Sequence, residues 1–168
     1  MHNQGRLAEA ERFYQQALAV DPNLMDARHM LGVLKAQQGC PGEAHDLIAP
    51  VVAANPRDAL ALANFGNVLH ALGRCEEALS AYGRSLAINP HYPPAWLAQG
   101  NVQQLVLRYG AALESYNRFL GFDPHNAEAW TNRGMALQHL NRLEEALESY
   151  GRAQALDPTL AQAFLNRG

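Results

Sequence analysis

The sequence predicts an all-α solenoid, in which antiparallel pairs of helices follow one another along the chain. The main observation is a fixed period, equal to the distance in sequence from Pro22 to Pro56, which several columns of residues share. These columns are the prolines Pro22, Pro56, Pro90, Pro124 and Pro158, the alanines Ala10, Ala44, Ala78, Ala112 and Ala146, the glycines Gly32, Gly66, Gly100, Gly134 and Gly168, and the mostly aromatic set Tyr14, Ile48, Tyr82, Tyr116 and Tyr150. A fixed period of about 20–50 residues is typical of repeats that bury their core between neighbours.

Each repeat is expected to open with a first helix and to continue through a tight turn. The first helices are expected to begin at Met25, Ala59, Pro93, Ala127 and Ala161. The equivalent turn positions hold residue types that accept the left-handed conformation at the end of a helix, namely Gly5, Gly39, Gly73 and Asn141. Leu107 stands at the same position and is the exception.

A second helix follows each turn, because apolar residues recur at three-and-four spacing in residues 79–87 and 147–156. It is expected to end at an Asn-Pro or Asp-Pro step, since the residue before proline is pushed out of the helical region. These steps begin at Asp21, Asn55, Asn89, Asp123 and Asp157. The chain opens with an unpaired second helix over residues 6–20. The glycine and alanine columns on facing helices predict points of close backbone approach.

An early tryptophan, then a glycine, an alanine, an aromatic residue and a proline recur in one frame, best in the repeats of Trp96 and Trp130. This pattern resembles the tetratricopeptide repeat (TPR) family over residues 5–168. The resemblance implies a right-handed superhelix and one array over residues 1–168, with a partial repeat 1–24, full repeats 25–58, 59–92, 93–126 and 127–160, and a partial repeat 161–168. Arg28 and Leu62 replace the early aromatic residue, and Gln99, Arg133 and Arg167 replace the leucine before the glycine, where we expect long polar stems to pack.

The composition excludes several partners and locations. A net charge of −3 and a pI near 6.1 provide no long-range attraction for nucleic acid or acidic membranes. No apolar run approaches the roughly 20 residues of a membrane span, and the first five residues lack the basic and apolar regions of a signal peptide. We therefore expect a cytoplasmic protein that binds neither nucleic acid nor membrane.

No residues combine into a catalytic or metal-binding pattern. The seven histidines form no pair at ligand spacing, and the acidic pairs Glu76-Glu77 and Glu144-Glu145 stand where they complement the dipole of a second helix. A catalytic triad, a phosphate-binding glycine loop and a dinucleotide fingerprint are missing from the sequence. We therefore expect that the protein is not an enzyme and that it binds neither a cofactor nor a metal. Cys40 and Cys75 are expected to be free thiols rather than a bridge.

The resemblance implies that the first helices line a concave face. The residues that it assigns to peptide binding there are Asn64, Asn67, His70, Leu97, Asn101, Gln104, Asn132, Gln138 and Asn166, with His29, Leu105 and His139 among their neighbours. This lining is nearly free of charge. Because amide side chains carry both a donor and an acceptor, they can bind the backbone of an extended peptide while reading little of its sequence.

The expected function is a protein–protein interaction scaffold that binds a peptide or protein partner in its concave groove. The asparagine rows also resemble the ladder of TPR arrays in bacterial O-GlcNAc-transferase-like proteins. The alternative is therefore a substrate-recognition or oligomerisation array of a larger enzyme such as a glycosyltransferase of that type. Phe164 and Leu165 belong to a helix without a partner, which predicts self-association through the open array ends.

Overall fold

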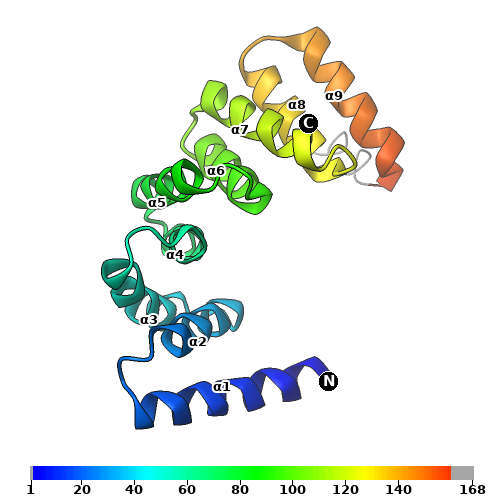
Figure 1. Cartoon of the computed structure of the whole chain (residues 1–168). Coiled ribbons are helices and arrows are strands. Elements are labelled where there is room, and N and C mark those ends of the chain that lie inside the picture. The colour runs from blue at the N-terminus through cyan, green and yellow to red at the C-terminus, as the bar shows by residue number, and fades with distance from the viewer. Residues whose placement is uncertain (1, 160–168) are drawn as a thin grey trace. The chain divides into compact units, whose positions relative to one another are not determined.

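The computed structural model describes residues 2–159, with side chains from residue 7 onward. Over these residues the chain forms helices and no strand, as expected for an all-α protein. The helices fall into two compact units, an N-terminal unit (Met1–Ile88) and a C-terminal unit (Asn89–Gly168). Figure 1 labels the helices in chain order.

The N-terminal unit contains α1 (His2–Val20), α2 (Met25–Gln37), α3 (Pro41–Ala54), α4 (Ala59–Ala71) and α5 (Cys75–Ile88). Within it, α2 packs on α3 and α4 packs on α5, while α3 joins the two pairs by packing on α4. The outermost helix, α1, packs on α2. The core of the N-terminal unit includes Ile48, Val51, Leu62 and Val68, which come from α3 and α4.

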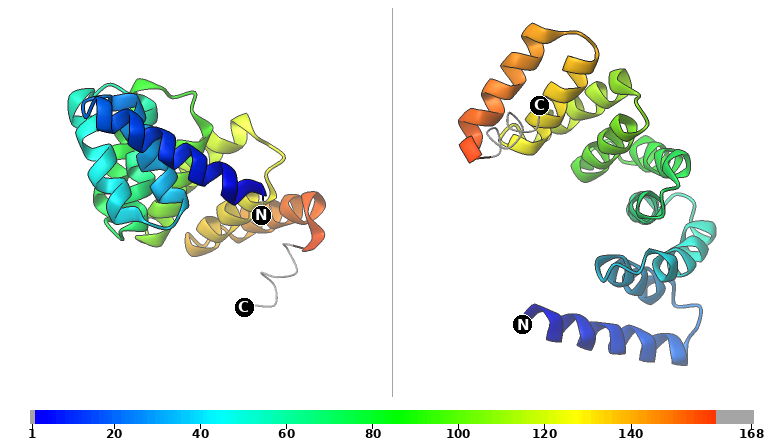
Figure 2. Two further views of the ribbon diagram at one scale, coloured as in Figure 1. Left: turned by 90° about the horizontal axis from the view of Figure 1, so that it is seen from below. Right: turned by 180° about the vertical axis from the view of Figure 1, so that it is seen from behind.

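The C-terminal unit contains α6 (Pro93–Leu105), α7 (Tyr109–Phe122), α8 (Ala127–His139) and α9 (Leu143–Leu156). Here α6 packs on α7, α7 on α8, and α8 on α9, and the views of Figure 2 show α8 and α9 as neighbouring arms of a hairpin. The predicted starts of the first helices at Met25, Ala59, Pro93 and Ala127 are thus confirmed. Ala161 lies outside the described residues.

The prediction of a turn at Gly5 is wrong, because α1 runs without a break from His2 to Val20 and Gly5 lies inside it. In the other repeats the left-handed residue reverses the chain between two helices that pack on each other. A glycine permits a reversal but does not impose one, so the helix continues through Gly5.

The remaining turns all adopt the left-handed conformation, with φ of 77° at Gly39, 74° at Gly73, 62° at Leu107 and 58° at Asn141. Each turn closes with the same two backbone bonds. At Leu107 these run from its own N–H to the Gln104 carbonyl (3.0 Å) and from the Arg108 N–H to the Gln103 carbonyl (2.8 Å). Such a pair of backbone hydrogen bonds satisfies the last carbonyls of a helix. Leu107 differs from its equivalents because a leucine side chain is strained at this φ.

Each second helix ends directly before an Asn-Pro or Asp-Pro step, as predicted. The structure adds a reason that the prediction lacked. At all five steps the side-chain oxygen of the Asn or Asp accepts a hydrogen bond from the backbone N–H two residues later, as between Asp21 and Asn23 at 2.9 Å or Asn89 and His91 at 3.1 Å. This Asx turn redirects the chain into the next first helix.

The glycines of the first helices lie at points of close approach to the second helix. A Cβ added to Gly66 would lie 2.6 Å from the Tyr82 ring, and one added to Gly100 would lie 2.7 Å from the Tyr116 ring. The glycines therefore make room for the mostly aromatic column of the second helix. The close approach predicted at the alanines stays a prediction.

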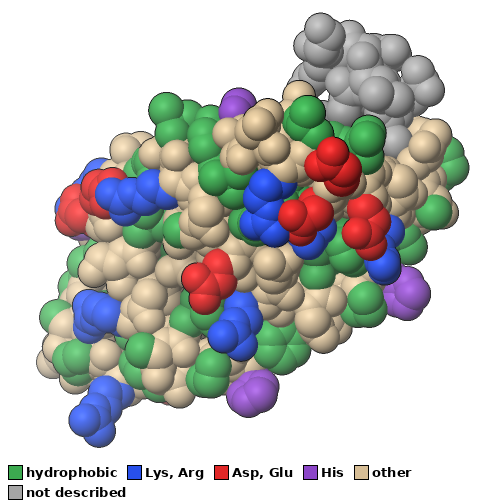
Figure 3. Space-filling view, turned by 90° about the horizontal axis from the view of Figure 1, so that it is seen from above, with side chains coloured by type: hydrophobic (Ala, Val, Ile, Leu, Met, Phe, Trp, Pro, Cys, Tyr) green, Lys and Arg blue, Asp and Glu red, His purple; other side chains and the backbone are tan. Residues whose placement is uncertain are grey.

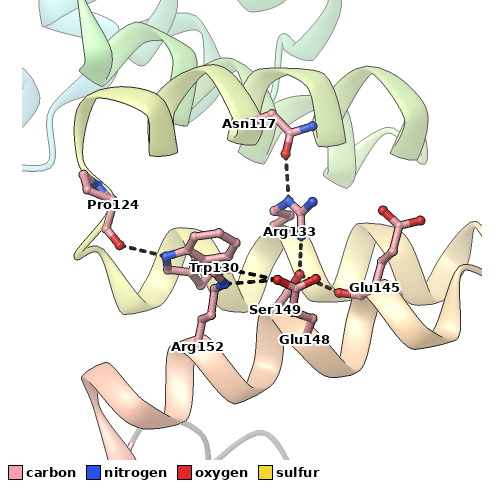
Figure 4. A network of polar contacts seen from close by, with 8 residues as sticks. All are labelled: Asn117, Pro124, Trp130, Arg133, Glu145, Glu148, Ser149 and Arg152. Carbon is pink, nitrogen blue, oxygen red and sulfur yellow. Dashed lines mark hydrogen bonds and ion pairs between the residues drawn. The ribbon is translucent and has the colours of Figure 1, made fainter.

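Arg133 and Arg28 stand at positions where the leucine and the early aromatic residue, respectively, were missing. Arg133 of α8 donates to Asn117 of α7 and to the buried Ser149 of α9, and its guanidinium lies over the Trp130 ring at 5.4 Å (Figure 4). Trp130 in turn donates to the Pro124 carbonyl at 2.9 Å, and Arg28 makes the corresponding bond to Pro22. The expected packing of long polar stems is thus confirmed for Arg133.

Two remaining features concern the whole described region. Cys40 and Cys75 are both free thiols. Within residues 2–159, no helix has the length and apolar character that crossing a membrane requires.

We predict that Leu107→Gly stabilises the protein by about 1 kcal/mol, since glycine adopts the left-handed conformation without strain. Little burial is lost, because the Leu107 side chain is 69% exposed. Urea unfolding measures the shift of the midpoint. The matched control is Asn141→Gly at the equivalent turn, where asparagine already tolerates this φ and the change should be smaller. A midpoint that stays or falls in Leu107→Gly would show that no strain is stored there.

We predict that Gly66→Ala destabilises the protein by about 1–3 kcal/mol, because the new methyl group would overlap the fully buried Tyr82 ring. Gly151→Ala is the control, since a Cβ at this exposed helical position meets nothing within 4 Å. That control should gain about 0.5–1 kcal/mol from helix propensity. Thermal unfolding of both variants checks the prediction, and equal shifts would refute it.

Candidate functional site

The polar side chains assigned to the groove lie on the first helices, and those of the N-terminal unit lie on α4. Asn64 of α4 contacts His29 of α2, with 3.0 Å between Asn64 Nδ2 and His29 Nε2. Because an amide nitrogen can only donate, the ring nitrogen must accept and the imidazole is neutral. His70 is half-buried near the end of the same helix.

Burial determines the protonation of His29. Its side chain is 6% exposed, and this desolvation lowers the pKa of His29 below its ordinary value. The carboxylates of Asp58 and Asp26 act in the opposite direction and are the smaller effects. The neutral ring therefore serves as a fixed acceptor that holds the Asn64 amide.

Asn67 is held differently, by a tyrosine of the next helix. The Tyr82 hydroxyl, from α5, donates to Asn67 Oδ1 at 2.8 Å. Tyr82 is fully buried, and this burial raises the pKa of its hydroxyl, so the group remains a donor. The Asn67 side chain is exposed. Because its oxygen accepts from Tyr82, the Nδ2 group points away from this bond and can donate.

The C-terminal unit repeats this arrangement with more partners. The Tyr116 hydroxyl of α7 donates to Asn101 Oδ1 at 2.9 Å and lies 3.2 Å from Gln104 Oε1, both on α6. Asn132 of α8 donates to the same Asn101 oxygen at 3.1 Å. On α9, the Tyr150 hydroxyl donates to Gln138 Oε1 at 2.9 Å. The pKa values of Tyr116 and Tyr150 are also raised, mainly by burial.

The common result is a fixed polarity of the groove amides. Asn67, Asn101 and Gln138 each accept a tyrosine hydroxyl with their side-chain oxygen, and Gln104 Oε1 lies near the hydroxyl that Asn101 accepts. Their nitrogen atoms, which can only donate, are the groups that point away from this bond. The sequence suggested a row of mixed donors and acceptors. The structure instead presents mainly donors to a ligand.

A pocket of about 440 Å³ lies within the C-terminal unit and collects several of these side chains. It contains three of the predicted residues and two of their predicted neighbours. Its lining is Asn101, Gln104, Leu105, Leu107, Tyr109, Tyr116, Asn132 and His139. The Tyr109 and His139 rings stack in parallel, with centroids 4.1 Å apart and an angle of 8°. None of the lining side chains is a carboxylate, a lysine or an arginine.

Three predicted residues do not join this arrangement. His70 has no part in the amide contacts described above and does not line the pocket. Leu97 of α6 is half-buried and packs against the core clusters around Tyr116 and Phe119. Asn166 lies outside the described residues. Sequence reasoning in turn missed Leu107, Tyr109 and the tyrosine hydroxyls. One signal was available, since Asn67 precedes Tyr82 by the same spacing in sequence as Asn101 precedes Tyr116.

Several charged side chains of the described region form local pairs, while Lys35 of α2 pairs with Glu11 of α1 and Glu43 of α3. Arg74 pairs with Glu77, Arg142 with Glu145 and Arg152 with Glu148, all on one helix or at its start. On the face drawn in Figure 3, basic and acidic side chains accordingly occur next to one another. Among residues 7–159, no group of three His, Cys, Asp or Glu side chains could hold a metal ion. The chemistry offered by these surfaces is hydrogen bonding and apolar contact.

We predict that His29 makes the protein less stable as the pH falls. Because the pKa of His29 is lowered in the folded state, the unfolded chain binds a proton first, and stability is lost as the pH falls through the ordinary histidine value of about 6.5. Urea unfolding at about pH 7.5 and pH 5.5 measures this loss. His29→Gln keeps an acceptor for Asn64 and cannot ionise, so this variant should lose less stability between the two pH values than the wild type does. Equal losses would contradict the prediction.

Comparisons with known proteins agree with this architecture. Three family models, each described as tetratricopeptide repeat, match residues 2–64, 59–89 and 127–160. A search of curated proteins finds no match.

Solved structures with the same fold include MamA, which is 23% identical, with a TM-score of 0.85 and coverage of 96% of this chain and 94% of MamA. A MamA structure from Desulfovibrio magneticus RS-1 has a TM-score of 0.76 at 23% identity and covers 81% of this chain and 77% of its own. YrrB, described as a TPR protein with an unusual peptide-binding site, has a TM-score of 0.83 at 23% identity. The match covers 98% of this chain and 86% of YrrB. At this identity the likeness concerns the fold, an all-α helical repeat solenoid. The repeat period, the helix pairs and these matches together show that the chain is a tetratricopeptide repeat protein.

Proposed function

We propose that this protein is an interaction scaffold that binds an extended segment of a protein or peptide partner along its first helices. The residues proposed to contact the partner are those that the sequence assigned, namely Asn64, Asn67, His70, Leu97, Asn101, Gln104, Asn132, Gln138 and Asn166. The observation that carries the proposal is the orientation of the groove amides by hydroxyls of the buried Tyr82 and Tyr116 and the half-buried Tyr150. No catalytic residue and no cofactor enter it.

The polarity of these amides defines what they can bind. An extended peptide presents a backbone carbonyl at every residue, and these oxygens accept hydrogen bonds from amide nitrogens. Holding each amide by its oxygen removes most of the rotational freedom that binding would otherwise restrict, so less entropy is lost on association. The uncharged lining avoids the desolvation of ions. The partner is therefore a neutral, extended segment read mainly through its backbone.

The alternative is an array that selects substrates for a larger enzyme, such as an O-GlcNAc-transferase-like glycosyltransferase. The solved structures with this fold, MamA and YrrB, do not favour it. YrrB carries a peptide-binding site by its description, which agrees with the scaffold proposal.

Other expectations from the sequence stay predictions. These are the organisation of residues 1–168 as one array, the cytoplasmic location and the absence of nucleic acid binding. Self-association through the array ends also stays a prediction. Phe164 and Leu165, on which it depends, lie outside the described residues, while Phe13 of α1 is 67% exposed.

We predict that the double variant Asn67→Asp, Asn101→Asp binds peptide at least about tenfold more weakly than the wild type. Aspartate keeps the oxygen that accepts from Tyr82 or Tyr116 but replaces the donor nitrogen by a second, charged acceptor. Alanine is a poorer choice, because it would leave a buried hydroxyl without a partner at a cost of about 1–3 kcal/mol. Peptides selected from a random displayed library on the wild-type protein supply the ligand, and calorimetry measures affinity.

Gln154→Glu is the control, since it makes the same chemical change at an exposed position of the second helix α9. Its affinity should equal that of the wild type. The proposal is wrong if the double variant binds the selected peptides as tightly as the wild type does while circular dichroism shows it folded.

A further inference from the structure

The pocket of the C-terminal unit is lined by polar and apolar side chains. The polar ones include Asn101 and Gln104, whose side-chain oxygens both lie within hydrogen-bond distance of the Tyr116 hydroxyl. Their nitrogens can donate to a ligand. The rim contains Leu105 and Leu107, which are 61% and 69% exposed. Polar and apolar groups thus lie side by side in one hollow.

Leu107 is unfavourable for stability in two respects. Its backbone is in the left-handed region at φ 62°, where a leucine is strained, and its side chain is mostly exposed to water. The equivalent positions hold Gly39, Gly73 and Asn141, which adopt this conformation readily. Strained residues of this kind cluster at binding sites, where the surrounding structure holds them in place. The turn carries Leu107 at the rim of the pocket although neither its backbone nor its exposure stabilises the fold.

The remaining wall is flat and aromatic. Tyr109, which begins α7, stacks on His139, the last residue of α8, and both line the pocket. The stack fixes the two rings relative to each other. A hollow of about 440 Å³ falls within the usual range of ligand sites and is larger than a small aliphatic side chain requires. A charged group would lose its hydration there and find no counter-ion among the lining side chains.

We propose that this pocket binds one large aromatic side chain of an extended peptide, with Leu105 and Leu107 covering the ring and the Asn101 and Gln104 amides donating to the adjacent backbone carbonyls. The proposal rests on the proposed function and adds an anchor residue to it. A single buried aromatic anchor commonly supplies most of the affinity of such an interface. The backbone contacts along the first helices then hold the segment on either side.

The test compares peptide selections from one random displayed library on three proteins, the wild type, Leu107→Gly and Asn141→Gly. Leu107→Gly removes the rim side chain without disturbing the turn. Asn141→Gly makes the same substitution at the equivalent turn, at a residue that does not line the pocket. We expect peptides from the wild type and from Asn141→Gly to share one Trp, Phe or Tyr position. Peptides selected on Leu107→Gly should lack this preference.

A double-mutant cycle then measures the contact itself. Replacing the shared aromatic residue of a selected peptide by alanine should weaken binding to the wild type about tenfold. The same replacement should have less than half of this effect, on a logarithmic scale, in Leu107→Gly. Melting curves accompany the measurement, since Leu107→Gly should bind more weakly although it is the more stable protein. If Leu107 acted on stability alone, peptide affinity and melting temperature would shift in the same direction in Leu107→Gly.

The outcomes separate this inference from the proposed function. If the wild type selects peptides whose binding depends on Asn67 and Asn101 but shows no aromatic preference, the pocket proposal is wrong and the scaffold proposal stands. An aromatic preference that Leu107→Gly retains, with additive effects in the cycle, also overturns the pocket proposal. If the selected peptides bind equally to the Asn67→Asp, Asn101→Asp variant, both proposals are wrong.

Discussion

The contact between a buried tyrosine and the glycine of the preceding first helix determines both the packing and the surface of these repeats. The rings of Tyr82 and Tyr116 fit only because Gly66 and Gly100 have no side chain. A buried ring, however, brings its hydroxyl with it, and that group must find a partner. It finds one in Asn67 or Asn101, at the surface of the first helix. The core contact therefore sets the orientation of the amides proposed to bind a partner.

The turn at Leu107 shows how stability and binding can impose opposite requirements at one position. A glycine would satisfy the left-handed backbone, as it does at Gly39 and Gly73. Leucine adds an exposed apolar side chain at the rim of the pocket instead. The same two backbone hydrogen bonds close the turn in all four repeats. The helix pair therefore imposes this backbone geometry on the leucine. Strain and exposure can therefore be measured separately by substitution at this position and at Asn141.

The helix boundaries could be predicted from the sequence because their causes are local. A proline disfavours the helical conformation at the residue before it, and a glycine or asparagine can end a helix within one turn. The failure at Gly5 has a different cause, since a glycine permits a turn but does not impose one. For the candidate site, the spacing between Asn67 and Tyr82, which recurs one repeat later, was visible in the sequence. Tyr150 breaks this rule, because Met135 stands at the corresponding place before it and its hydroxyl bonds Gln138 instead.

The sequence by itself determined the repeat period, the helix pairs and the nearly uncharged lining assigned to the first helices, because each follows from residue type and spacing along one chain. Only the tertiary structure decided which atom of each amide faces outward, since this depends on a hydroxyl that comes from another helix. It also decided that Leu107, Tyr109 and His139 meet in one pocket. Leu107 and His139 are distant in sequence, and packing of α6, α7 and α8 brings them together. Such proximity arises from the geometry of the assembled helices, which residue type and spacing alone do not specify.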